Sequence, residues 1–187
     1  FRSVLLPVFV AVLLAETGGR VQASAHALGL KFGAPGPILA ALALSTLANL
    51  AVAGIGGALV ADMISFQART LLAGLALLFA GLPMLMPRKA ASEPKGSAAF
   101  PAGLRAFGPA QFGDASQFIV FAMAARADLP VLGVAAGLVA TLAAAFVPLA
   151  MGRDWPGALP LTWLRRIAAL LLALAGAWMI VSALRLV

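Results

Sequence analysis

Long apolar runs constrain this chain more than any other feature of its sequence. Of its 187 residues, 63% are hydrophobic and only 10% are charged, whereas soluble domains carry about 25% charged residues. A helix that crosses the ~30 Å hydrocarbon core of a bilayer needs about 20 apolar residues. We therefore expect an all-α integral membrane protein. By length alone the sequence predicts six transmembrane helices, at about residues 3–32, 38–63, 66–86, 102–127, 131–151 and 161–184.

Two of these predicted spans are interrupted by polar residues and glycine. The interruption in the first span consists of Glu16, Gly18, Gly19, Arg20 and Gln22. The interruption in the fourth span consists of Gln111, Gly113, Asp114, Ser116 and Gln117. A charged or polar group in hydrocarbon is costly, so such residues usually face the interior of a helix bundle or a water-filled path. Polar, glycine-broken segments at matching places in two halves of a chain point to the binding site of a transporter.

The two interruptions belong to an internal repeat. The halves align without a gap at an offset of 95 residues, and the matched pairs include Gly18 and Gly113, Gln22 and Gln117, Pro35 and Pro130, and Thr46 and Thr141. Each repeat holds three predicted spans, and an odd number reverses the orientation of the second half. We therefore expect two inverted three-helix repeats, at residues 1–86 and 102–187, joined by a polar linker at residues 87–101.

The distribution of positive charge predicts how the chain lies in the membrane. The net charge of +7 does not indicate a nucleic-acid partner, because the basic residues lie singly or in pairs between apolar runs. One set of segment ends carries Lys31, Arg88, Lys89, Lys95, Arg105, Arg153, Arg165 and Arg166. The opposite ends carry Arg2, Arg69, Arg126 and Arg185. Because basic residues favour the cytoplasmic side, we expect a cytoplasmic linker, and we expect the membrane to be a bacterial inner membrane.

Residue types that many enzymes need are scarce in this chain. It has no cysteine and only one histidine, which excludes disulfides, thiolate metal sites and a multi-histidine metal site within one chain. No set of nucleophile and base emerges from the sequence. We expect neither an enzyme nor a tightly bound cofactor.

The polar interruptions predict a site for cations and protons. Inverted halves bring the first and fourth spans together near the middle of the bilayer, so we expect Glu16 and Asp114 to lie close to each other and to act as metal ligands. Carboxylates flanked by amides and hydroxyls suit hard cations such as Ca²⁺, Mn²⁺ or Mg²⁺, and carboxyl groups in apolar surroundings also bind protons. The further ion- or proton-binding residues that we expect are Gln22, Gln111, Ser116 and Gln117. The residues that we expect to modulate the site are Gly18, Arg20, Gly113 and His26.

Simpler roles remain open for several of these residues. Glu16 and Arg20 are four residues apart, the spacing of an ion pair on one helix. Gln22 and Gln117 could each form a hydrogen bond between helices. His26 could relay protons or could be a hydrogen-bonded histidine near a helix end. We expect a polar face on the second span mainly to join helices, and its members are Ser45, Thr46 and Asn49.

The two interruptions also carry a recognisable motif pair. The first, residues 16–21, reads Glu-Thr-Gly-Gly-Arg-Val, and the second, residues 111–116, reads Gln-Phe-Gly-Asp-Ala-Ser. Both resemble the motif E-x-G-D-[KR]-[TS] of the small membrane cation–proton exchangers, which include Golgi manganese/calcium transporters and bacterial manganese exporters. Neither copy is complete, and the losses are complementary. The residues that match the motif are Glu16, Gly18, Arg20, Gly113, Asp114 and Ser116.

The resemblance implies a fold of two inverted three-helix repeats and the exchange of a divalent cation, Mn²⁺ or Ca²⁺, for protons. Two alternatives remain: a degenerate family member that serves as a non-transporting membrane subunit or assembly factor, and an exporter of small solutes. The expected partners are the lipid bilayer, divalent cations and protons, together with further copies of the chain or another membrane subunit. Nucleic acid is not an expected partner.

Overall fold

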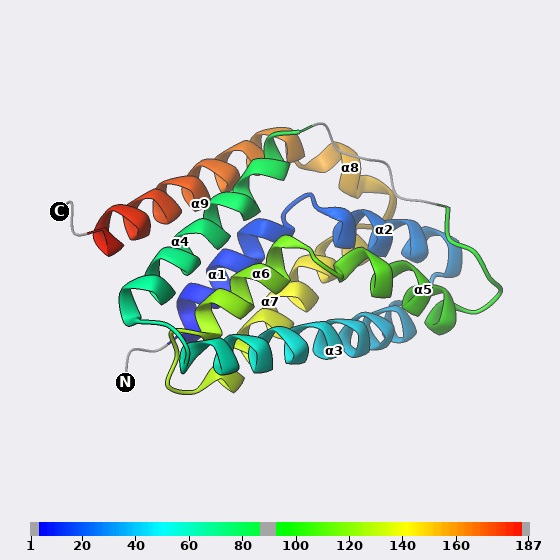
Figure 1. The fold of residues 1–187 in the computed structure, drawn as a ribbon. Coiled ribbons are helices and arrows are strands. Elements are labelled where there is room, and N and C mark those ends of the chain that lie inside the picture. The colour runs from blue at the N-terminus through cyan, green and yellow to red at the C-terminus, as the bar shows by residue number, and fades with distance from the viewer. Residues whose placement is uncertain (1–3, 87–92, 185–187) are drawn as a thin grey trace.

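The computed structural model describes residues 4–86 and 93–184, and every regular element in these ranges is helical (Figure 1). Residues 87–92, which belong to the predicted linker, lie outside the described residues. The same holds for residues 1–3 and 185–187, the outer ends of the two predicted repeats.

The first half contains a broken helix followed by two long helices. Its elements are α1 (Leu5–Glu16), α2 (Arg20–Phe32), α3 (Pro35–Ala61), α4 (Phe66–Gly81) and the short 3₁₀ helix η1 (Leu82–Leu85). Gly33 ends α2 in a left-handed conformation, with φ of 60°, as is common after the last turn of a helix. A proline then occupies the first position of α3, where its missing N–H costs no helical hydrogen bond.

The second half repeats this order and adds a short connection before its last helix. Its elements are α5 (Ala99–Gln111), α6 (Ala115–Ala124), α7 (Pro130–Met151), the 3₁₀ helix η2 (Gly152–Asp154), α8 (Trp155–Ala158) and α9 (Leu161–Ala183). A proline again begins the long middle helix, at the position that the 95-residue offset predicts.

The candidate membrane spans confirm a repeated helical membrane fold and refine the predicted spans. Within the described residues, four helices are long and apolar enough to cross a bilayer: α3, α4 together with η1, α7 together with η2, and α9. A fifth span is the pair α1 and α2, which is bent by 64° at its break. The fourth predicted span, at residues 102–127, lies instead as two short helices of 13 and 10 residues, α5 and α6. Its polar interruption divides it, so neither helix has the length of a full span.

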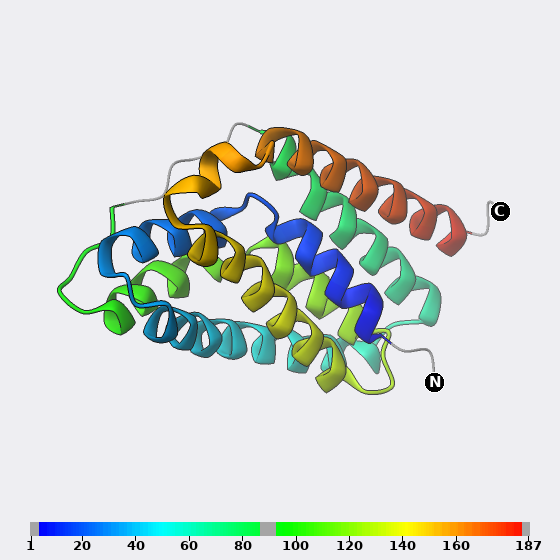
Figure 2. The same cartoon turned by 180° about the vertical axis from the view of Figure 1, so that it is seen from behind.

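The two halves run in opposite directions, as the odd number of spans predicted. The path from α1 to α2 leads from one end of the molecule toward the other, and the path from α5 to α6 leads back (Figures 1 and 2). The long helices α3 and α7 are antiparallel to each other, as are α4 and α9.

Small residues allow α4 and α9 to pack closely along each other. A Cβ atom added to Gly176 would lie 2.6 Å from the carbonyl oxygen of Gly74, and one added to Gly81 would lie 2.9 Å from that of Ala169. Gly81 and Gly176 are equivalents at the 95-residue offset, and so are Gly74 and Ala169. The two contacts are therefore equivalent to each other, and the crossing follows the symmetry of the repeat. Close backbone approach through small residues is a usual basis of helix association in bilayers.

Two large apolar clusters fill most of the interior, with a polar layer between them, and a third, small cluster joins α4 and α6. One cluster is built from α1 and α6 with adjoining turns of α3, α4, α7 and α9, and the other from α2 and α5 with adjoining turns of α3 and α7. Along α3, Leu50 belongs to the first cluster and Leu42 to the second, and Thr46 lies between them. The polar layer therefore crosses the long helices near their middle, and the helix breaks lie at the same level (Figure 1).

Candidate functional site

Each interrupted span breaks at a glycine whose backbone is left-handed. The angle φ is 65° at Gly18 and 73° at Gly113, values that residues with side chains rarely adopt. As a result Glu16 is the last residue of α1 and Gln111 the last residue of α5. These two residues are equivalents in the repeat, and their side chains leave the helix ends at the level of the polar layer.

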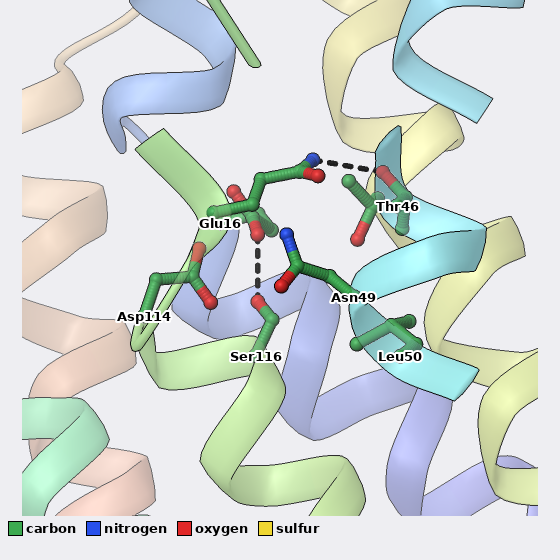
Figure 3. Close-up of a pocket in the computed structure, with 8 residues that line it drawn as sticks. Glu16, Thr46, Asn49, Leu50, Asp114 and Ser116 are labelled. Carbon is green, nitrogen blue, oxygen red and sulfur yellow. Dashed lines mark hydrogen bonds between the residues drawn. The ribbon is translucent and has the colours of Figure 1, made fainter. Parts of the chain in front are cut away.

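A central cavity of about 10 Å³ lies beside the two breaks (Figure 3). It is lined by Glu16, Thr46, Asn49, Leu50, Gln111, Asp114, Ser116 and Thr141. Its volume is close to the lower limit for one water molecule. The central cavity therefore suits a single small ion or water, whereas pockets for organic ligands measure about 300–1,000 Å³.

The carboxylates of the two incomplete motifs meet at this cavity. Glu16, which is only 4% exposed, accepts a hydrogen bond of 2.6 Å from the hydroxyl of Ser116 (Figure 3). Asp114 is the N-cap of α6, where its side chain accepts from the backbone N–H of Gln117 at 3.2 Å. Both the cap and the positive end of the helix dipole favour a negative charge at that position. Glu16, Asp114 and Ser116 were predicted to share a site, and the structure brings them together.

Neutral oxygen atoms complete the lining of the central cavity. Gln111 is buried and donates a hydrogen bond of 2.8 Å from its amide nitrogen to the hydroxyl of Thr46. The amide oxygen of Gln111 and the hydroxyl of Thr141 are buried without a hydrogen-bond partner among the described residues. Buried polar atoms are nearly always hydrogen-bonded, so an unpaired one calls for an explanation such as an unseen water or ion.

The donor set around the cavity is rich in oxygen and poor in charge. Within residues 4–86 and 93–184, no three His, Cys, Asp or Glu side chains gather closely enough to hold a metal ion. An ion in the central cavity would therefore bind to two carboxylates and to hydroxyl and amide oxygens. Such a set suits hard cations rather than soft ones.

Arg20 does not neutralise Glu16 in the way that their spacing suggested. The break places Glu16 at the end of α1 and Arg20 at the start of α2, so they do not share one continuous helix. The Arg20 side chain is exposed, and in the described part of the chain no ion pair joins it to Glu16. A different basic residue covers the first break: a Cβ atom at Gly18 would lie 2.7 Å from Cδ of Arg165, whose guanidinium donates to the carbonyl of Pro83 at 3.3 Å.

Besides Gly18, Arg20 and Gly113, three further predicted site residues lie outside the lining of the central cavity. Gln22 and Gln117 each bind the glycine of their own break through the side-chain oxygen, at 2.7 Å for Gly18 and 2.6 Å for Gly113. His26 lies further along α2, where Nε2 is 2.9 Å from the carbonyl oxygen of Gly152 and the ring packs against Trp155, with centroids 5.0 Å apart.

Sequence reasoning missed part of the lining. Thr46 and Asn49 were expected mainly to join helices, and Thr141 received no role. The repeat contained a usable signal for the threonines, because Thr46 and Thr141 are equivalents. It contained none for Asn49, whose equivalent is Ala144.

An open apolar groove also lies on the surface of α3 and α7. It is lined by Leu39, Ala40, Ala43, Leu142, Ala143 and Phe146. A ligand site normally carries a few polar groups that orient the ligand, and this lining has no polar side chain. The groove therefore resembles the lipid-facing surface around it more than a solute site.

Comparison with protein families gives one match, which covers nearly the whole chain. The family model described as "Divalent cation/proton antiporter GDT1" matches residues 4–92 and again residues 99–186. The two matched segments correspond to the two halves of the fold. No curated protein and no solved structure matches the chain.

Proposed function

Since this chain belongs to the GDT1 family of divalent cation/proton antiporters, we propose that it exchanges Mn²⁺ or Ca²⁺ for protons through the central cavity. The family is one of membrane transporters and not of enzymes. The observation that carries the proposal is the meeting of Glu16 and Asp114, one from each half, at a cavity of the size of a single ion.

The lining supports a divalent cation as the transported substrate. Two carboxylates supply the full charge of one divalent ion, and neutral oxygens can complete its coordination. Ca²⁺ and Mn²⁺ are hard or borderline cations that favour such ligands. Of these neutral groups, the amide oxygen of Gln111 and the hydroxyl of Thr141 have no other described partner and would lose no hydrogen bond by binding the ion.

The same carboxyl groups support proton exchange. Two of them can hold two protons, which is the charge of one divalent cation. Proton binding at Glu16 and Asp114 would remove the negative charge that attracts the cation, and cation binding would expel the protons. Binding of one substrate at the expense of the other is what antiport requires.

We further propose an arrangement in a bacterial inner membrane, with repeats at residues 1–86 and 102–187 and a cytoplasmic linker at residues 87–101. The excess of lysine and arginine at the segment ends on the linker side supports this orientation. The proposed partners are the lipid bilayer, divalent cations and protons, with further copies of the chain or another membrane subunit as protein partners. We propose no tightly bound cofactor and no nucleic-acid partner.

The two alternative functions have less support. A non-transporting subunit would be favoured by a Glu16–Arg20 pair without a cavity, but Glu16 binds Ser116 and lines the central cavity. An exporter of small solutes would be favoured by a roomy apolar pocket, but the central cavity holds only about 10 Å³ and the apolar groove on α3 and α7 is an open surface rather than an enclosed pocket.

Flux measurements in proteoliposomes test the proposal directly. We expect Mn²⁺ or Ca²⁺ uptake to be accompanied by opposite movement of protons, followed with a pH-sensitive dye inside the vesicles. Glu16→Gln and Asp114→Asn keep the shape of each side chain and remove its charge, and each should reduce the flux to the background of empty vesicles.

Two exposed carboxylates provide matched controls. Glu93→Gln and Asp62→Asn make the same chemical changes away from the cavity, and both variants should retain the unmodified flux. Unchanged cation flux in the Glu16→Gln/Asp114→Asn double variant would disprove the proposal. Absence of flux for Mn²⁺, Ca²⁺, Mg²⁺ and Na⁺ in the unmodified protein would favour the non-transporting subunit.

A further inference from the structure

Gln22 and Gln117 make equivalent contacts that connect the two halves of the molecule. Each side-chain oxygen accepts from the glycine N–H at the break of its own half. Each side-chain nitrogen reaches the long helix of the opposite half: Gln22 donates to the carbonyl of Ala144 in α7 at 2.8 Å, and Gln117 reaches Asn49 in α3. Ala144 and Asn49 are themselves equivalents at the 95-residue offset.

The acceptor on α7 exists because of a proline. In a helix the carbonyl of Ala144 would accept from the N–H of residue 148, but residue 148 is a buried proline inside α7 and has no N–H. The carbonyl would otherwise be left unpaired in the interior, where an unsatisfied polar group is costly. Gln22 supplies the missing donor.

The acceptor on α3 is of a different kind. Residue 53, four positions after Asn49, is an alanine with a normal N–H. The backbone carbonyl of Asn49 can thus accept a helical hydrogen bond from that N–H. The side-chain nitrogen of Gln117 lies 3.5 Å from the carbonyl oxygen of Asn49, which is long for a hydrogen bond. Gln117 instead lies closer, at 3.2 Å, to the side-chain oxygen of Asn49. The equivalent of that side chain in the other half is the methyl group of Ala144, which offers no acceptor.

We infer that Gln22 and Gln117 are positioning residues that tie the break of each half to the long helix of the opposite half, and that Pro148 creates the acceptor for Gln22. The oxygen and the nitrogen of each side-chain amide are both engaged in these ties, and neither residue lines the central cavity. Their effect on transport rests on the proposed function. They hold the glycine that follows Glu16 in one half and precedes Asp114 in the other, and so set where the two carboxylates lie.

The tie predicts a rescue that is specific to one glutamine. Gln22→Met keeps the length of the side chain and removes both hydrogen bonds, which leaves the Ala144 carbonyl unpaired. Adding Pro148→Ala restores an N–H at residue 148 and pairs that carbonyl within α7. We therefore expect Gln22→Met to lower the melting temperature of the purified protein in detergent, and Gln22→Met/Pro148→Ala to recover part of the loss.

Gln117→Met is the matched control, because its acceptor does not depend on Pro148. It should lower the melting temperature as well, but Pro148→Ala should bring no recovery. Equal recovery in both glutamine backgrounds, or recovery in neither, would overturn the inference. Should Gln22→Met not be recoverable from membranes, Gln22→Asn serves instead, since its shorter side chain cannot reach both partners.

Flux kinetics separate positioning from ion binding. In proteoliposomes we expect Gln22→Met to lower the maximal Mn²⁺ flux by about threefold to twentyfold, the range of single interhelical hydrogen bonds in membranes, with little change in the half-saturating Mn²⁺ concentration. A large rise in that concentration with an unchanged maximal flux would assign Gln22 to the ion site instead. Absence of flux in the unmodified protein, together with the expected pattern of melting temperatures, would count against the proposed function and leave the ties standing.

Discussion

Ser116 supplies Glu16 with a hydroxyl group that the first motif lacks at the equivalent position. The equivalent of Ser116 in the first half is Val21, and the equivalent of Asp114 is Gly19. Each incomplete motif therefore depends on the other: one contributes the glutamate, and the other contributes the aspartate and the hydroxyl. The hydrogen bond from Ser116 to Glu16 at 2.6 Å joins these contributions.

Substitution of Ser116 tests this dependence. Hydrogen bonds to charged groups contribute about 1.5–3 kcal/mol, so we expect Ser116→Ala to raise the half-saturating cation concentration by about tenfold or more. Ser116→Thr retains the hydroxyl and should stay closer to the unmodified protein. Ser45→Ala is the control, because Ser45 is also buried but does not line the central cavity. An equal effect of Ser45→Ala would show that the cavity hydroxyl has no special role.

The two helix breaks have the same backbone conformation but different surroundings. Gly18 and Gly113 have nearly equal positive φ values. A side chain at Gly18 would collide with Arg165, which reaches over the break from α9, whereas a side chain at Gly113 would meet nothing within 4 Å. The first break is thus covered by a neighbouring helix, and the second has free space beside it.

Alanine substitutions should reveal this difference. The left-handed conformation costs a residue with a side chain about 1–2 kcal/mol, so Gly113→Ala should lower the free energy of unfolding by about that amount. Gly18→Ala should lower it further because of the contact with Arg165. The measurement is unfolding of the purified protein in detergent.

Arg165→Ala provides the internal control for these substitutions. Combined with Gly18→Ala, it should remove the extra destabilisation, whereas combined with Gly113→Ala it should not change the effect of the glycine substitution. Equal destabilisation by Gly18→Ala and Gly113→Ala would contradict the difference between the two breaks.

Inversion of the two halves is a property of the whole molecule. It brings α1 against α6 and α2 against α5, and so places both breaks at the same level, beside α3 and α7 (Figures 1 and 2). Only in that arrangement can residues of two distant motifs line one cavity. Equivalent positions in the two halves must then face opposite sides of the membrane.

Single cysteines test the inversion, because the chain has none of its own. Asp62 and Gly157 are equivalents at the 95-residue offset, and both are exposed. With a membrane-impermeant thiol reagent, we expect Asp62→Cys to be labelled from the outside of intact cells and Gly157→Cys only in inverted vesicles. Labelling of both cysteines from one side would contradict the inversion. Labelling of Gly157→Cys from the outside and of Asp62→Cys only in inverted vesicles would reverse the proposed orientation but leave the inversion intact.

The sequence by itself determined the membrane class, the boundaries of the long helices and the inversion. These follow from features that can be read along the chain: the length of each apolar run, the glycines and prolines at helix ends, and the odd number of spans in each repeat. It also predicted that Glu16 and Asp114 lie close together, since the offset of 95 residues puts them at nearly matching places in inverted halves, and both line the central cavity.

Only the tertiary structure decided which partner each polar group has. The spacing of Glu16 and Arg20 allowed an ion pair on one helix, but the left-handed Gly18 lies between them at the helix break, and Glu16 accepts a hydrogen bond from Ser116. Nothing in the sequence indicated that Arg165 lies over Gly18 or that Gln22 donates to the Ala144 carbonyl left free by Pro148, because the residues of each pair lie more than 100 positions apart. Such contacts depend on how helices cross in space, which spacing along a chain does not encode.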